Sequence, residues 1–151
     1  PMIRRLIILL LIVGCEKDTV APVIGRQPSS NCTISDPGYI QALEWDEVEL
    51  WGVTYDIETT TSIDLNNQEL TGSIPPEIGC LTNLEYLYLY DNQLTGGIPS
   101  EIGNLTNLDY LALFNNQLTG EIPPEVCDLI ESNNLDINWI LTGNNLINTC
   151  D

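Results

Sequence analysis

The sequence predicts an α/β solenoid, a fold in which short coils of similar sequence stack on one another. The main observation is a fixed period of 24 residues, which places Ile63, Leu87 and Leu111 in one register. Thr-Gly pairs and prolines recur at the same interval, at positions 71–72, 95–96 and 119–120 and at positions 75, 99 and 123. A period of roughly 20 to 29 residues is typical of units that cannot bury their apolar faces alone and therefore stack.

The second observation is an alternation of residue types within the repeat. Leu87 and Leu89 alternate with Tyr86, Tyr88 and Tyr90, and this period of two is typical of a half-buried β-strand. We expect the leucines to point inward and the tyrosines outward. In a stack of coils, each fully buried leucine contributes about 1.5 to 3 kcal/mol before conformational entropy is counted.

An asparagine follows the predicted strand at the point where the backbone leaves the sheet. Asn92 and Asn116 occupy this position, Asn144 restores it near the C-terminus, and Gln68 replaces it in the first repeat. A carboxamide both donates and accepts hydrogen bonds, whereas a carboxylate only accepts them. We therefore expect these asparagines to be structural turn residues.

The remainder of the repeat predicts a short helical turn on the outer side of the coil. Gly96 permits a positive φ, and Pro99 cannot donate a hydrogen bond to a sheet. Ile98, Ile102 and Leu105 are three or four residues apart, as on one face of a short helix.

The repeat resembles a known family. The segments LTGSIPPEIGCLTNL, LTGGIPSEIGNLTNL and LTGEIPPEVCDL are similar to the plant-type subclass of leucine-rich repeats, which occurs in receptor-kinase ectodomains and in some bacterial surface proteins. The resemblance covers roughly residues 45–146. It implies a short right-handed superhelix with a concave parallel β-sheet, convex 3₁₀ turns and a cap at each end. It also implies a ligand-binding module.

The N-terminus predicts export. Arg4 and Arg5 precede the apolar residues 6–13, a stretch too short for a membrane span of about 20 residues but suitable for a signal peptide. Gly14 and Cys15 end this stretch and resemble a bacterial lipobox, so Cys15 is the expected lipidation site. The alternative is an ordinary signal peptide and a secreted soluble protein.

The chain is expected to divide into five segments. These are a signal peptide over residues 1–14, a lipidated flexible tether over 15–30, an N-terminal cap over 31–60, three repeats over 61–134 and a C-terminal cap over 135–151.

Both caps depart from the repeat. Apolar residues between 39 and 51 are spaced by three to five residues and predict a short cap helix. The following segment LWGVTY resembles the family's W-x-G-V-x-C element, with Tyr55 at the position of the cysteine. At the other end, Trp139 and Leu141 are expected to restore the strand pattern, although the interval from Leu111 to Trp139 is longer than one period.

Four cysteines follow Cys15, namely Cys32, Cys80, Cys127 and Cys150. In an exported chain they suggest disulfides, with three possible connectivities. Cys80 and Cys127 lie nearly two coils apart, about 9 to 10 Å, which exceeds the reach of a disulfide. We therefore predict one disulfide in each cap, Cys32–Cys80 and Cys127–Cys150. A zinc site is the weaker alternative, because there is no C-x-x-C pair and no histidine.

The charge of the chain excludes several classes of partner. The formal net charge is −18, and only Lys17 and Arg26 are positive beyond the signal peptide. Nucleic-acid binding requires clustered Lys or Arg, so no nucleic-acid partner is expected, and any membrane contact is expected only through a lipid anchor. Calcium binding is an alternative explanation of the acidity, but no D-x-[DN]-x-[DN]-G loop occurs. No metal or other cofactor is expected.

The sequence also argues against an enzyme. The absence of histidine excludes the Ser-His-Asp and Cys-His triads and the H-E-x-x-H motif. A glycosidase needs only two carboxylates, but the repeat accounts for most of the acidic residues as exposed variable positions. We therefore predict a non-enzymatic protein.

The outward strand positions predict a ligand-binding face. Across neighbouring coils they form three rows: Ser62, Tyr86, Tyr110; Asp64, Tyr88, Ala112; and Asn66, Tyr90, Phe114. The candidate ligand-binding residues are Tyr86, Tyr88, Tyr90, Asp91, Tyr110, Phe114, Asn115 and Asp64. An exposed cluster of rings marks an interaction site, although tyrosine and phenylalanine also stabilise sheets.

These observations favour a cell-surface recognition module for a protein or glycan. The alternative is a surface spacer or adhesive subunit that binds copies of itself, and the sequence leaves the oligomeric state and the ligand open.

Overall fold

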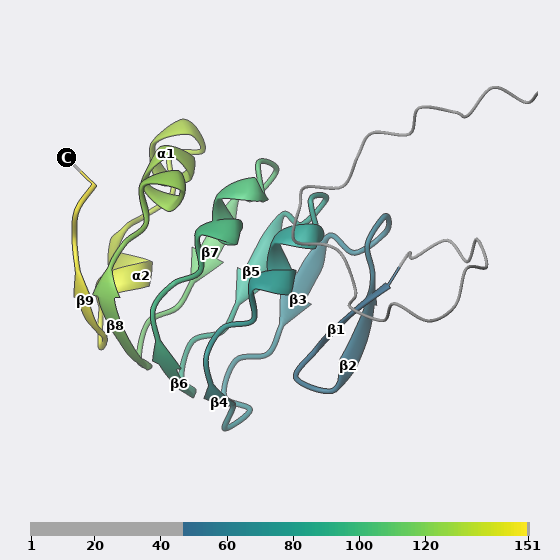
Figure 1. Cartoon of the computed structure of the whole chain (residues 1–151), viewed down its shortest axis with the longest axis horizontal. Coiled ribbons are helices and arrows are strands. Elements are labelled where there is room, and N and C mark those ends of the chain that lie inside the picture. The colour runs from purple at the N-terminus through teal and green to yellow at the C-terminus, as the bar shows by residue number, and fades with distance from the viewer. Residues whose placement is uncertain (1–46, 151) are drawn as a thin grey trace, which may run out of the picture.

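The structure is a computed structural model that describes residues 47–150, which form a single stack of coils (Figure 1). The parallel strands and the convex turns confirm the predicted leucine-rich-repeat α/β solenoid. The predicted signal peptide, the lipidation site Cys15, the tether and Cys32 lie outside the described residues.

Three strands form the predicted parallel sheet. They are β3 (Ser62–Asp64), β5 (Tyr86–Tyr88) and β7 (Tyr110–Ala112), in the order β3-β5-β7. Ile63 pairs with Leu87, and Leu87 pairs with Leu111. The register of the sheet therefore equals the period of the sequence.

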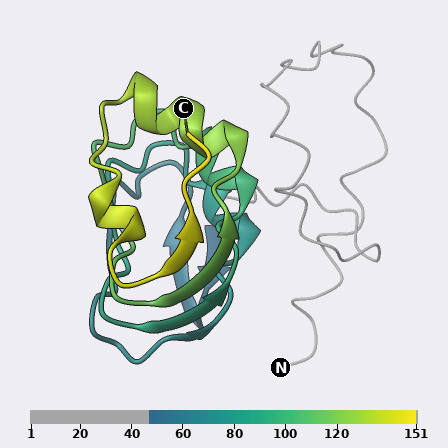
Figure 2. The ribbon, with the colours of Figure 1, turned by 90° about the vertical axis from the view of Figure 1, so that its left-hand side faces the viewer.

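A second parallel sheet lies on the other side of the coil. It contains β4 (Thr71–Gly72), β6 (Gln93–Gly96), β8 (Gln117–Glu121) and β9 (Asn145–Ile147), in that order. The Thr-Gly pairs belong to these strands, and Gly96 has the predicted positive φ, at 77°. Figure 2 looks along the stack and shows β8 and β9 on one side of the coil and α2 on the other.

The convex turns are 3₁₀ helices in the first two coils, as predicted, and an α-helix in the third. They are η2 (Pro76–Cys80), η3 (Ser100–Asn104) and α1 (Pro124–Ser132). In α1, Val126, Leu129 and Ile130 are buried, and this spacing of three and four residues suits an α-helix.

Two glycines allow each convex turn to pack closely against the next one. A Cβ atom on Gly79 would lie 2.4 Å from the Glu101 carbonyl oxygen, and one on Gly103 would lie 2.7 Å from the Glu125 carbonyl oxygen. Cys127 occupies the equivalent position on α1, one period after Gly103. No later convex turn packs against α1 among the described residues, so this position tolerates a side chain.

The core runs through the whole stack as one cluster of buried side chains. Leu87 and Leu89 are fully buried, whereas Tyr86, Tyr88 and Tyr90 are half-buried. The predicted inward and outward faces of the strand are therefore confirmed. Among residues 47–150, Asn92 and Asn116 are the buried polar side chains.

These asparagines join each coil to the one before it. The Asn116 Oδ1 atom accepts a hydrogen bond from the Leu94 N–H at 3.0 Å, and its Nδ2 atom donates to the Leu89 and Leu113 carbonyl oxygens at 2.9 and 3.0 Å. Asn92 makes the equivalent bonds to Leu70, Leu65 and Leu89. Asn144 continues the series with bonds to Leu118 and Leu113. Each carboxamide thus uses both its donor and its acceptor.

The N-terminal cap differs from the prediction. Residues 47–50, which were expected to belong to a helix, form strand β1 (Glu47–Leu50), which pairs antiparallel with β2 (Val53–Asp56). Trp51 and Gly52 form the two-residue turn with φ values of 49° and 79°, as a type I′ hairpin turn requires. Val48 and Leu50 are buried, and this alternation suits a strand.

The C-terminal cap also differs from the prediction, because residues 138–141 form a single helical turn, α2 (Asn138–Leu141), in place of a strand. Its backbone still continues the ladder. The Leu113 N–H donates to the Trp139 carbonyl oxygen at 2.8 Å, and the Asn115 N–H donates to the Thr142 carbonyl oxygen at 2.9 Å. The extra residues in this cap are therefore accommodated without losing the hydrogen bonds of the last coil.

A disulfide closes this cap. It joins Cys127 on α1 to Cys150 after β9, the pairing that the sequence predicted. Cys80 is also disulfide-bonded, and its predicted partner, Cys32, lies outside the described residues. No helix within residues 47–150 is long and apolar enough to cross a membrane.

The first prediction concerns the coil-to-coil asparagine. Asn116→Asp replaces a buried donor by an oxygen that faces the Leu89 and Leu113 carbonyl oxygens, and we expect a loss of about 1 to 3 kcal/mol of unfolding free energy. Urea denaturation measures it. Asn145→Asp, at an exposed position on β9, is the control for the added charge, and equal midpoints for the two variants would contradict the prediction.

The second prediction concerns the convex glycines. Gly103→Ala places a methyl group against the Glu125 backbone, and overpacking of this kind costs about 1 to 3 kcal/mol. At Gly97, the control position, the nearest contact of an added Cβ is the Thr119 carbonyl oxygen at 3.7 Å, so Gly97→Ala is expected to preserve stability. Thermal unfolding of both variants decides the matter, and a stable Gly103→Ala variant would refute the packing argument.

Candidate ligand-binding face on the concave sheet

The β3-β5-β7 sheet places the predicted aromatic side chains on one surface. Tyr86 and Tyr88 lie on β5 and Tyr110 lies on β7, while Tyr90 and Phe114 follow these strands by two residues. The register pairs Tyr86 with Tyr110, and the Asp91 N–H donates to the Phe114 carbonyl oxygen. The rows expected from the sequence are therefore present in the fold.

The rings contact one another along and across the strands. The Tyr90 and Phe114 rings are stacked with centroids 4.5 Å apart and planes 11° apart, and the Tyr86 and Tyr110 rings are stacked at 5.5 Å. Tyr88 lies between these pairs, with its centroid 6.4 Å from Tyr86 and 6.5 Å from Tyr90.

Trp139 extends this surface and was not identified as a site residue from the sequence. It was expected only to restore the strand pattern of the cap, and its side chain is 41% exposed. Its ring centroid lies 6.1 Å from Tyr110 and 6.3 Å from Phe114. We call the six rings the aromatic face: Tyr86, Tyr88, Tyr90, Tyr110, Phe114 and Trp139. Tyr110 and Trp139 are its most exposed members, with Tyr110 at 47%.

A hollow of about 760 Å³ opens on the aromatic face. Its ring-bearing walls are Tyr88 and Tyr90 from the second coil, Phe114 from the third and Trp139 from α2. Its polar lining is Asp64, Asp136, Asn138 and Thr142. The hollow thus combines side chains from all three coils and from the C-terminal cap.

Ala112 differs from its expected placement on the outward face. It occupies the same row as Asp64 and Tyr88, but its side chain is a single methyl group. The position was expected to be outward, whereas the structure buries it completely. The Ala112 methyl group is therefore covered and does not line the hollow.

The two carboxylates of the hollow are held in the same way. The Asp64 Oδ1 atom accepts hydrogen bonds from the N–H and the Nδ2 atom of Asn66. The Asp136 Oδ1 atom accepts from the N–H of Asn138 at 2.9 Å and from its Nδ2 atom at 2.8 Å. Each aspartate is thus fixed by the asparagine two residues later. No hydrogen bond to either Oδ2 atom is present within residues 47–150.

The Tyr88 hydroxyl stays protonated near neutral pH. Partial burial raises the pKa of this hydroxyl above its ordinary value of 10.0, and the neighbouring Tyr86, Tyr110 and Asp64 raise it further. Tyr88 can therefore donate a hydrogen bond to a ligand at the edge of the hollow.

Four predicted site residues do not line the hollow, namely Tyr86, Tyr110, Asp91 and Asn115. Asp91 and Asn115 lie in the turns after the strands, with positive φ values of 55° and 54°. The Asn115 Nδ2 atom donates to the Asp91 Oδ1 atom at 2.7 Å, so the two side chains bridge neighbouring coils. The structure brings together Asp64, the tyrosines and Phe114, but it assigns Asp91 and Asn115 to the turns.

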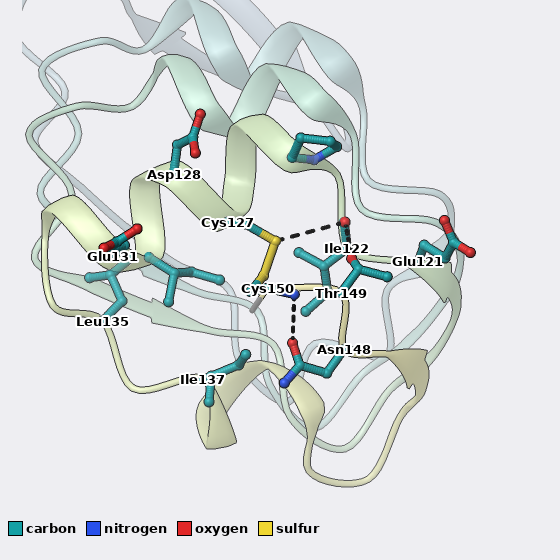
Figure 3. Close-up of a pocket in the computed structure, with 12 residues that line it drawn as sticks. Glu121, Ile122, Cys127, Asp128, Glu131, Leu135, Ile137, Asn148, Thr149 and Cys150 are labelled. Carbon is teal, nitrogen blue, oxygen red and sulfur yellow. Dashed lines mark hydrogen bonds between the residues drawn. A yellow bond between two sulfur atoms is a disulfide. The ribbon is translucent and has the colours of Figure 1, made fainter.

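A second hollow, of about 650 Å³, lies beside the Cys127–Cys150 disulfide at the end of the stack (Figure 3). Its lining mixes apolar side chains such as Leu135 and Ile137 with the carboxylates of Glu121, Asp128 and Glu131. Within residues 47–150 no group of three or more His, Cys, Asp or Glu side chains is placed to hold a metal ion.

The third prediction measures how far the aromatic face stabilises the sheet. The closely stacked pair, Tyr90 and Phe114, should show a coupling of about 0.5 to 1.5 kcal/mol in a double-mutant cycle of Tyr90→Ala and Phe114→Ala. Urea denaturation of the two single variants and the double variant provides this value. Strictly additive losses would show that the stacking itself adds no stability.

Comparisons with known proteins agree with this architecture. Residues 82–124 match the family described as Leucine Rich repeats (2 copies), and residues 59–81 match the family described as Leucine Rich Repeat. No curated protein matches the chain as a sequence relative.

Solved structures of plant receptor ectodomains resemble the chain. The ectodomain of the receptor kinase SOBIR1 from Arabidopsis thaliana is 31% identical over 64% of this chain and 50% of that one, with a TM-score of 0.51. The BIR3–SERK2 complex from the same plant matches at 36% identity, 58% and 43% coverage and a TM-score of 0.48.

A third match is the ectodomain of the Arabidopsis thaliana receptor kinase GASSHO1/SCHENGEN3 in complex with CASPARIAN STRIP INTEGRITY FACTOR 2. It is 35% identical over 58% of this chain and 10% of that one, with a TM-score of 0.48. The chain therefore spans half or less of these ectodomains. From the two family matches and the stacked coils, the chain contains leucine-rich repeats over residues 59–124 and has a leucine-rich-repeat solenoid fold.

Proposed function

We propose that the chain is an exported, non-enzymatic recognition module that binds a protein or glycan through the aromatic face. The observation that carries the proposal is the grouping of six rings beside a hollow on the concave sheet. Tyrosine and tryptophan combine a large apolar area with a polar group at low entropic cost. Exposed rings grouped in this way are typical of interaction sites.

The comparison with SOBIR1 supports this proposal. That structure is the leucine-rich-repeat ectodomain of a receptor kinase, and the present chain shares its fold over the repeats. A receptor ectodomain faces the outside of the cell, which agrees with the export that residues 1–14 predict. Attachment to a membrane through a lipid on Cys15 is part of the proposal.

The charge distribution favours a different partner over a second copy of the chain. Every charged side chain in residues 47–150 is Asp or Glu. Two identical acidic surfaces repel each other, which disfavours the alternative of a self-associating spacer. Sedimentation at increasing protein concentration distinguishes the two functions, because a spacer would form larger species.

The fourth prediction tests the aromatic face directly. The full chain and a Tyr88→Ala/Tyr90→Ala variant are immobilised and exposed to a panel of glycans and cell-surface proteins. We expect the wild-type chain to retain a ligand and the variant to lose it, since a hot-spot residue contributes about 2 kcal/mol or more.

Ile147→Ala is the matched control, because Ile147 is 57% exposed on β9, away from the aromatic face. Circular dichroism establishes that all variants remain folded. Equal binding by the double variant, or loss of its fold, would assign the rings to sheet stability and place the function elsewhere.

A further inference from the structure

The chemistry of the hollow indicates the class of partner, if the aromatic face is the binding surface proposed above. Its walls are four aromatic rings, and its charged lining is the pair Asp64 and Asp136. The repeats supply no positive charge of their own, because residues 47–150 contain no Lys, Arg or His. A ligand must therefore bring any positive charge that neutralises these carboxylates.

Aromatic rings and carboxylates attract the same kind of group. The face of an aromatic ring is electron-rich and attracts a cation, most strongly at tryptophan. A carboxylate attracts a cation through its full negative charge. The carboxylates repel an anionic ligand. A neutral sugar can stack on the rings and donate hydrogen bonds to the carboxylates, but it does not neutralise their charge. The combination in this hollow is therefore complementary to a cation.

Each of the two carboxylates has an Oδ2 atom that can accept a further hydrogen bond. In each, Asn66 or Asn138 holds the Oδ1 atom and fixes the orientation of the carboxylate. No described residue donates to Oδ2, so this atom can accept from a ligand. Because the asparagines hold the side chains in place beforehand, a ligand loses less entropy in ordering them.

Among cations, the guanidinium group of arginine fits both features. It is planar, so it stacks on a ring while its edge donates hydrogen bonds to a carboxylate. A bare metal ion would need several oxygen or nitrogen ligands at one point, and the described residues contain no such cluster. The volume of about 760 Å³ exceeds one side chain and can hold neighbouring residues of the same segment.

We propose that the hollow between Tyr88, Tyr90, Phe114 and Trp139 is a docking site for an arginine side chain of a basic protein partner. The guanidinium group lies against the rings and donates to the Oδ2 atom of Asp64 or Asp136. The acidic surface around the hollow draws the basic segment toward it, and salt weakens this attraction.

Two acetylated and amidated pentapeptides test the proposal, Gly-Ser-Arg-Ser-Gly and the same peptide with citrulline, the neutral isostere of arginine. Each is titrated into the ¹⁵N-labelled full chain, and the indole N–H resonance of Trp139, assigned with a Trp139→Phe variant, reports binding. We expect saturable binding of the arginine peptide in the millimolar range or tighter and binding of the citrulline peptide weaker by about tenfold.

Three single variants test whether arginine binding depends on the carboxylates of the hollow. Asp64→Asn and Asp136→Asn keep an oxygen for the asparagine contact but remove the charge, and each should weaken arginine binding several-fold. Glu77→Gln removes one charge from the exposed surface of η2, outside the hollow, and should leave binding nearly unchanged. If all three variants weaken binding equally, the attraction is general to the acidic surface and the docking site is refuted.

The remaining outcomes separate this inference from the function it rests on. Equal binding of the two peptides with a shift of the Trp139 resonance would overturn the preference for a cation and leave the aromatic face as a binding surface. No saturable shift with either peptide would overturn the arginine site itself. Loss of the captured ligand in the Tyr88→Ala/Tyr90→Ala variant decides the proposed function separately.

Discussion

The hydrogen bonds of Asn92, Asn116 and Asn144 hold the coils at a fixed spacing, and the rest of the structure depends on that spacing. Each carboxamide bonds to its own coil and to the coil before it, at the point where the strand ladder stops. Because the side chains are short, they allow little variation in the distance between coils. The leucines consequently stay in register inside, and the same register brings the tyrosine rows into contact outside.

Much of the fold could be predicted because the same pattern of residues recurs in successive coils. The constant repeat interval defined the register of β3, β5 and β7, and the alternation at Leu87 and Leu89 defined the buried side. Residues 47–50 were assigned to a helix because the spacing from Val48 to Trp51 is compatible with one. Such a short segment contains too few residues to distinguish the helical period from the strand period. The turn was also hard to predict, because tryptophan does not favour the positive φ that Trp51 adopts.

The candidate site could be predicted only where it belongs to the repeat. The rows through Tyr86, Tyr88 and Tyr90 followed from the period, whereas Trp139, Asp136 and Asn138 follow an insertion that breaks it. A signal was nevertheless present, since Asp136-Ile137-Asn138 repeats the Asp64-Leu65-Asn66 pattern of the first coil. This pattern indicates a site only when the helical turn α2 is known. The turn places the tryptophan ring outward, while the Trp139 carbonyl oxygen continues the sheet.

The exchange of glycine for Cys127 determines where the stack can grow. Gly79 and Gly103 present a bare backbone to the following convex turn, so a unit bounded by such glycines can accept another unit behind it. Cys127 presents a side chain there and is joined to Cys150. A duplicated internal coil would therefore keep the close packing of the convex turns and leave the Cys127–Cys150 disulfide in place. A coil added behind α1 would instead meet the Cys127 side chain and its bond to Cys150.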